Sequence, residues 1–130
     1  MPYLLKIPES AVFGAGNFKN AQGHTECAEF VRQATNAPGT PSWKAGRKVL
    51  GAKGGEILRG TAIATFDADS RYPTDALGRH AAIYLYQTLT GIFVLDQWNA
   101  QGEVLKRFIS FGKPKGTRRS NDGSTFFVIE

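Results

Sequence analysis

The sequence predicts an α+β domain in which one N-terminal helix packs on a mostly antiparallel sheet of about five strands. Two observations lead to this prediction. Residues 25–35 repeat apolar side chains with the period of a helix, and after residue 60 the period changes to two, which is typical of strands. A length of 130 residues with 42% hydrophobic residues is sufficient for one buried core without disulfides. We therefore expect a single domain spanning residues 1–130.

The predicted helix is the stretch TECAEFVRQAT. Thr25 is the expected N-cap, and Glu26 in the first turn suits the positive end of the helix dipole. The segment NAPGTP, residues 36–41, ends the helix because its glycine and prolines cannot continue the pattern. Apolar side chains at i, i+3, i+4 and i+7 form one stripe: Cys27, Phe30, Val31 and Ala34.

The second half of the chain has the alternation of strands. Residues 41–60 give weak, glycine-rich signals that are compatible with a short helix between loops. The strand-like segments are 61–66, 80–87, 91–98, 103–111 and 124–130. The short hairpin TLTG joins the second to the third, and we expect the last segment to be an edge strand.

The charge is basic, with a formal value of +5 and a pI near 9.6. A surface of this sign attracts polyanions without selecting among them. One alternative is therefore a non-enzymatic basic module that binds an anionic polymer or partner. Only Phe108 and Phe111 are available nearby to stack on bases, so nucleic acid is a poor candidate partner. Much of the charge lies in one late cluster: Lys106, Arg107, Lys113, Lys115, Arg118 and Arg119.

The sequence has no recognisable secretory signal and no candidate membrane span. The N-terminus MPYLLKIPESAVFG lacks the basic, apolar and small-residue regions of a secretory signal. No segment approaches the roughly 20 apolar residues of a membrane span. We therefore expect a chain that is made in the cytoplasm without a signal peptide and that has no membrane span.

The single cysteine, Cys27, cannot form an internal disulfide, and no CxxC pair is present. His24 and Cys27, spaced i and i+3, could bind a metal with His80 as third ligand, but no acidic residue forms a motif with them. The glycine clusters lack the phosphate-binding pattern GxxxxGK[ST]. We accordingly expect neither a metal nor an organic cofactor.

A nucleophilic role for Cys27 follows from its position. The N-terminal end of a helix favours a thiolate, and the apolar stripe turns the thiol toward the sheet. His80 begins a strand beneath the helix and is the better candidate base. If residues 80–98 fold as a hairpin about Thr88, Asp96 lies opposite His80, and a turn shifted by one residue would offer Gln97 instead. The alternative is that Cys27 is a small core residue and His80 is structural.

These residues also resemble a family. HTECAEFVR, GTAIATF and GRHAAIYLYQ are similar to the NlpC-type and CHAP-type cell-wall peptidases of the papain-like superfamily, and the size and layout resemble small amidase effectors that bacteria inject into rivals. The resemblance implies a papain-like fold and hydrolysis of amide bonds in peptidoglycan peptides. It implies Cys27 as nucleophile, His80 as base and Asp96 as third member.

The resemblance has further implications. The papain-type glutamine would fall at Ala21, with Gln22 one place off, so the backbone N–H of Cys27 becomes the expected oxyanion donor. Peptidoglycan is the implied substrate, the periplasm or cell wall the implied place of action, and an immunity protein or secretion machinery the implied protein partners. An inactive papain-like fold that only binds is the alternative. Apart from the resemblance, four residues are candidate substrate contacts: Trp43, Tyr72, Arg79 and Gln97.

Overall fold

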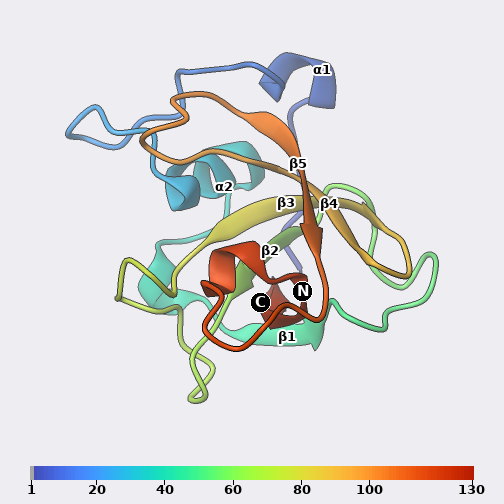
Figure 1. Cartoon of the computed structure of the whole chain (residues 1–130). Coiled ribbons are helices and arrows are strands. Elements are labelled where there is room, and N and C mark those ends of the chain that lie inside the picture. Colours follow the sequence, from blue (N-terminus) through green and yellow to red (C-terminus); the bar gives the residue numbers. More distant parts are fainter. Residues whose placement is uncertain (1) are drawn as a thin grey trace.

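The protein is an α+β structure built on one antiparallel sheet, as the computed structural model of residues 2–130 shows (Figure 1). The strands lie in the order β1-β6-β2-β3-β4-β5. Short 3₁₀ helices cover Thr40–Ser42, Arg119–Asn121 and Gly123–Thr125. The helices and strands are α1 (Glu9–Val12), α2 (Cys27–Thr35), β1 (Ala45–Lys48), β2 (Ala62–Thr65), β3 (Ala81–Gln87), β4 (Gly91–Asp96), β5 (Leu105–Ser110) and β6 (Phe126–Ile129).

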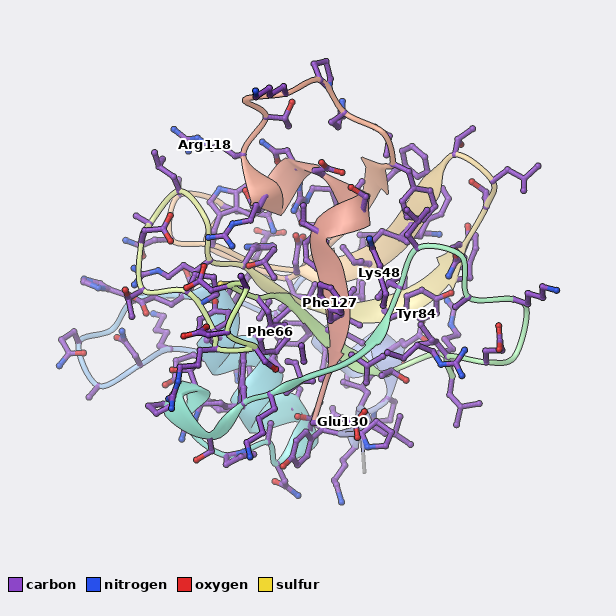
Figure 2. All side chains as sticks on the ribbon, turned by 90° about the horizontal axis from the view of Figure 1, so that it is seen from below. Lys48, Phe66, Tyr84, Arg118, Phe127 and Glu130 are labelled. Carbon is purple, nitrogen blue, oxygen red and sulfur yellow. The ribbon has the colours of Figure 1, made fainter. Side chains whose placement is uncertain are left out.

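The sheet has six strands, so the expectation of five was wrong. The additional strand is β1, whose sequence AGRK has no apolar alternation and is held by backbone pairing, with Ala45 opposite Ile129. β6 also pairs with β2, with Ile63 opposite Val128, so β6 is an interior strand and not the predicted edge. Figure 2 shows β1 with Lys48 and β6 with Phe127 and Glu130 from below.

The helical part differs from the expectation as well. The four-residue α1 precedes α2, which begins at Cys27 with Glu26, not Thr25, as its N-cap. Neither Glu26 nor another side chain caps this end, and Thr25 instead donates its hydroxyl proton to the Trp98 carbonyl over 3.3 Å. The helix ends at Asn36, which adopts the left-handed conformation with φ 62°.

The core forms two clusters, one on each face of the sheet. Helix α2 lies against β3 and packs its apolar stripe on small side chains such as Ala64 and Ala81, which allow the helix to approach closely (Figure 1). Cys27 is partly buried at the margin of this cluster. The other face carries residues that alternate with these, including Ile63 and Ala82. Among residues 2–130, no helix is both long enough and apolar enough to cross a membrane.

Candidate active site

Cys27 and His80 meet where the start of α2 approaches the start of β3. The Cys27 sulfur lies close enough to the His80 side chain and to the Ala81 backbone N–H for both groups to lower the pKa of the thiol. The Tyr72 hydroxyl lies 3.5 Å from the same sulfur. As the first residue of the helix, Cys27 sits at the positive end of the dipole. The sulfur therefore has three polar neighbours and the helix end to stabilise a negative charge.

His80 connects this thiol to a buried carboxylate. Its Nε2 lies 2.8 Å from Oδ2 of Asp96, and the side chains are 6% and 0% exposed. The backbone is fixed too, because the His80 N–H donates to the Thr65 hydroxyl over 3.0 Å. Since Nε2 faces Asp96, Nδ1 is the nitrogen that remains for the sulfur. The three side chains thus form a continuous chain of polar contacts.

The strand register that brings Asp96 to His80 differs from the predicted one. Ile83 pairs with Leu95, and the register shifts at a bulge between Tyr84 and Tyr86. Asp96 is therefore diagonal to His80 on the same face of the hairpin, not directly opposite. A diagonal pair is still within reach because an imidazole is long enough to span it.

Arg107 is a site residue that the sequence did not reveal. Its Nε and Nη2 donate to Oδ2 of Asp96 over 2.9 and 2.7 Å, and Nη2 lies 3.3 Å from His80 Nε2. The guanidinium also lies over the Trp98 ring, 5.4 Å from its centroid. In the sequence Arg107 was one member of a basic cluster, and only the pairing of β5 with β4 places it beside Asp96.

Burial and charge shift the pKa values of these groups in opposite directions. Burial raises the pKa of the Cys27 thiol, but the hydrogen bond and charge of His80, with smaller contributions from Tyr72 and Ala81, outweigh it, so the pKa lies below its ordinary value. Burial lowers the pKa of His80, yet Asp96 and Cys27 raise it to about 9. The pKa of Asp96 is lowered, because His80 and Arg107 overcome the effect of burial. At neutral pH these shifts favour a thiolate beside an imidazolium.

The three-residue chain opens into a cavity of about 640 Å³. Tyr72 and Arg79, two of the candidate substrate contacts, line it together with Cys27 and His80. The rest of the wall comes from six regions of the chain: Glu26 and Ala28; Thr40; Ala76; Trp98 and Asn99; Arg107; and Arg118, Ser120 and Asn121.

The other two candidate substrate contacts do not line this cavity. Trp43 is 1% exposed, donates its indole N–H to the Pro38 carbonyl over 2.8 Å, and packs its ring against Tyr72 at 4.9 Å. Gln97 is fully buried, and its Nε2 donates to the carbonyls of Phe18 and Glu26, each over 2.8 Å. Both residues support the site from behind: Trp43 braces Tyr72, and Gln97 ties the end of β4 to the start of α2.

The structure gives little support to the two alternative sites, a metal site and a basic binding surface. Among residues 2–130, no three His, Cys, Asp or Glu side chains come together in a way that could hold a metal ion, so a site formed by His24, Cys27 and His80 has no support. The basic cluster is not one free patch either. Arg107 pairs with Asp96, and Arg119 pairs with Asp67 and Asp75.

Comparison with known proteins yields three consistent findings. A family model described as domesticated amidase effector 2 matches residues 9–129. A type VI secretion amidase effector 2 protein of Salmonella typhi is 36% identical over 117 residues, which cover 82% of this chain and 86% of that protein. A solved structure described as type 6 secretion amidase effector 2 superposes with a TM-score of 0.79 at 32% identity, covering 97% of this chain and 93% of the other.

Proposed function

The chain belongs to the domesticated amidase effector 2 family, and from this membership and the geometry of the cavity we propose that it is a cysteine hydrolase that cleaves amide bonds in peptidoglycan peptides. Its relatives are named as amidase effectors. The observation that carries the proposal is the continuous chain from the Cys27 thiol through His80 to Asp96 at the wall of an open cavity. The fold fits the papain-like superfamily, and we place the protein near its NlpC-type and CHAP-type members.

In the proposed mechanism His80 holds the proton of the Cys27 thiol. The thiolate attacks the amide carbonyl and forms a carbon–sulfur bond, and the carbonyl electrons move to its oxygen. When the tetrahedral adduct collapses, the carbon–nitrogen bond breaks and His80 gives its proton to the leaving amine. A water molecule, deprotonated by His80, then hydrolyses the thioester and restores the thiol.

Three further groups support these steps. The backbone N–H of Cys27 has no intrahelical acceptor, because it belongs to the first turn of α2, so it is free to stabilise the oxyanion. Asp96 keeps the imidazole oriented with Nδ1 toward the sulfur and stabilises its positive charge. Arg107 is a positioning residue that holds the Asp96 carboxylate through two hydrogen bonds to Oδ2.

Purified peptidoglycan tests the proposal. We expect Cys27→Ala and His80→Ala to reduce the release of soluble fragments by at least about 1,000-fold, because nucleophile and base act as a unit. His24→Ala is the matched control, since it removes the other histidine from an exposed position outside the cavity. Circular dichroism checks that the variants are folded, and mass spectrometry of the fragments identifies the bond. Digestion at the parent rate by either active-site variant would disprove the proposed roles.

The place of action is part of the proposal. The names of the Salmonella typhi relative and of the solved structure specify type VI secretion. We propose that this chain is likewise delivered to the cell wall of a target cell, and that an immunity protein protects the producer. Inhibition of peptidoglycan digestion by a protein encoded beside this one would test the second part.

A further inference from the structure

We propose that Arg118, together with Arg79, binds a carboxylate of the substrate close to the amide bond that is cleaved, so that the substrates are peptides with a free carboxylate at that position. The inference rests on the proposed function and specifies its substrate class.

Arginines without a carboxylate partner gather at this cavity. Of eight arginines in the chain, six lie within ion-pair distance of a carboxylate: Arg32, Arg47, Arg59, Arg71, Arg107 and Arg119. The two exceptions within residues 2–130 are Arg79, whose Nη1 lies 3.4 Å from the Thr74 carbonyl, and Arg118, whose side chain has no hydrogen bond or ion pair. Both exceptions line the cavity that contains Cys27 and His80.

Arg118 projects from a segment that is anchored by its neighbours. The neighbouring Arg119 donates to the Phe66 carbonyl over 3.2 Å and forms ion pairs with Asp67 and Asp75 at 3.0 and 3.3 Å. Its guanidinium also lies against Gly78, where an added Cβ would come within 2.0 Å of Nη2. This contact brings the backbone at Arg118 next to the loop that carries Arg79.

The same segment is fixed from the catalytic side. Arg107 donates through Nη2 to the Ser120 carbonyl and through Nη1 to Oδ1 of Asn121, each over 3.0 Å. Arg118 itself is exposed where the chain enters the 3₁₀ helix after the β5 loop (Figure 2). The backbone below it is therefore held at both sides, while its guanidinium stays free for a ligand.

The charges of the cavity favour an anionic ligand group. Cys27 and His80 together carry no net charge, either as thiolate and imidazolium or as thiol and imidazole, and Asp96 is paired with Arg107. Glu26 also lines the wall but makes no ion pair with either free arginine within the described residues. A guanidinium binds a carboxylate through two parallel hydrogen bonds, so a ligand carboxylate supplies the partner that the protein omits here.

Cleavage of two forms of one substrate tests this inference. The probes are purified peptidoglycan and the same material with its carboxyl groups converted to primary amides by carbodiimide and ammonia. We expect amidation to lower the parent rate by about 10-fold or more, comparable to the loss of one charge-assisted contact. Arg118→Gln should lower the rate on untreated peptidoglycan by a similar factor and reduce the effect of amidation to about two-fold. Lys115→Gln is the matched control, because it removes the same charge from the same loop outside the cavity.

A binding measurement separates this inference from the proposed chemistry. Inactive Cys27→Ala protein should co-sediment with untreated peptidoglycan about 10-fold more strongly than with the amidated form, and adding Arg118→Gln should reduce that preference to about two-fold. If this preference is present while the parent protein cleaves neither form, the proposed hydrolysis fails and the carboxylate site stands. Equal cleavage and equal binding of both forms, or an undiminished preference in Arg118→Gln, would overturn the carboxylate site.

Discussion

Nε2 of His80 lies 2.8 Å from Oδ2 of Asp96, and the same carboxylate oxygen accepts both hydrogen bonds from Arg107, while Oδ1 has no partner among the described residues. All polar contacts of this buried carboxylate thus converge on one atom. An imidazole and a guanidinium share it, and the imidazole is the group that faces the thiol. The orientation of His80 therefore depends on a group outside the three-residue chain.

The first prediction concerns the ionisation of Cys27. The pKa of the Cys27 thiol is lowered and that of His80 is raised to about 9, so both shifts extend the pH range in which a thiolate and an imidazolium coexist. Alkylation by iodoacetamide should be fast at pH 7, slow down as the pH falls through the thiol pKa, and remain fast above pH 9. Amide cleavage should instead fall again above about pH 9, since His80 then lacks the proton for the leaving amine.

Rates of alkylation, followed by mass spectrometry, and rates of peptidoglycan digestion over the same pH range check this difference. Free cysteine is the reference for the thiol. Alkylation of Cys27 only after unfolding would contradict the prediction and favour a buried structural cysteine.

The second prediction concerns Asp96. Asp96→Asn keeps the shape of the side chain but removes the charge that raises the pKa of His80 and that pairs with Arg107. We expect cleavage to fall by about 10- to 1,000-fold, less than for Cys27→Ala, because an orienting group matters less than a nucleophile. Because the pKa of His80 should then be lower, the decrease of the cleavage rate at high pH should begin at a lower pH than in the parent protein.

Asp96→Asn should also reduce the free energy of unfolding by about 3 kcal/mol, since it leaves a buried cation without its partner. The folded pKa of Asp96 is lowered, so its contribution is present above its ordinary pKa and is lost as the pH falls. The folded pKa of His80 is raised, so its contribution is present below about 6.5 and is lost as the pH rises through about 9. Urea unfolding at pH 6 and pH 10 should show a larger difference between parent and variant at pH 6, and an equal difference would contradict this linkage.

Sequence reasoning predicted that Cys27, His80 and Asp96 lie close together, because the position of each depends on local periodicity or on a short hairpin. The details of the register were wrong. The hairpin turns between Gln87 and Ile92, not about Thr88, and the bulge near Leu85 then changes the register of β3 and β4 by one residue; no sequence signal marks either feature. β1 was missed because its residues are ordered by hydrogen bonds to β6, such as that from the Lys44 N–H to the Glu130 carbonyl over 2.8 Å.

Side-chain roles were harder still to predict. Trp43 was expected in a cleft because it is aromatic, yet its N–H finds an acceptor in the interior at the Pro38 carbonyl, so the whole ring can be buried. Arg107 was grouped with solvated cations, although β5 pairs Arg107 with Val94, on the same sheet face as Asp96. Predicting the position of Arg107 would have required the pairing register of β4 and β5.

The third prediction concerns Arg107. Arg107→Lys keeps the charge but cannot donate through Nε and Nη2 together, so the Asp96 carboxylate loses its fixed orientation. We expect kcat to fall by about 10-fold with a smaller change in KM, and Arg107→Gln to have a larger effect. Arg47→Lys is the control, because it alters an exposed ion pair with Glu56 outside the cavity. Parent kinetics in Arg107→Gln would exclude a positioning role.

The last prediction concerns Tyr72, whose hydroxyl lies 3.5 Å from the Cys27 sulfur. Burial, followed by the charge of the neighbouring thiolate, raises the pKa of Tyr72, so its hydroxyl stays protonated and donates to the sulfur. Tyr72→Phe removes this donor but keeps the ring contact with Trp43 at 4.9 Å, so the fold should be retained. The acid limb of Cys27 alkylation should move to higher pH by up to about one unit, equivalent to about 1.4 kcal/mol of lost thiolate stabilisation. Tyr86→Phe, at an exposed ring on β3, is the matched control. An unchanged acid limb in Tyr72→Phe would leave His80, Ala81 and the helix end as the only stabilising groups.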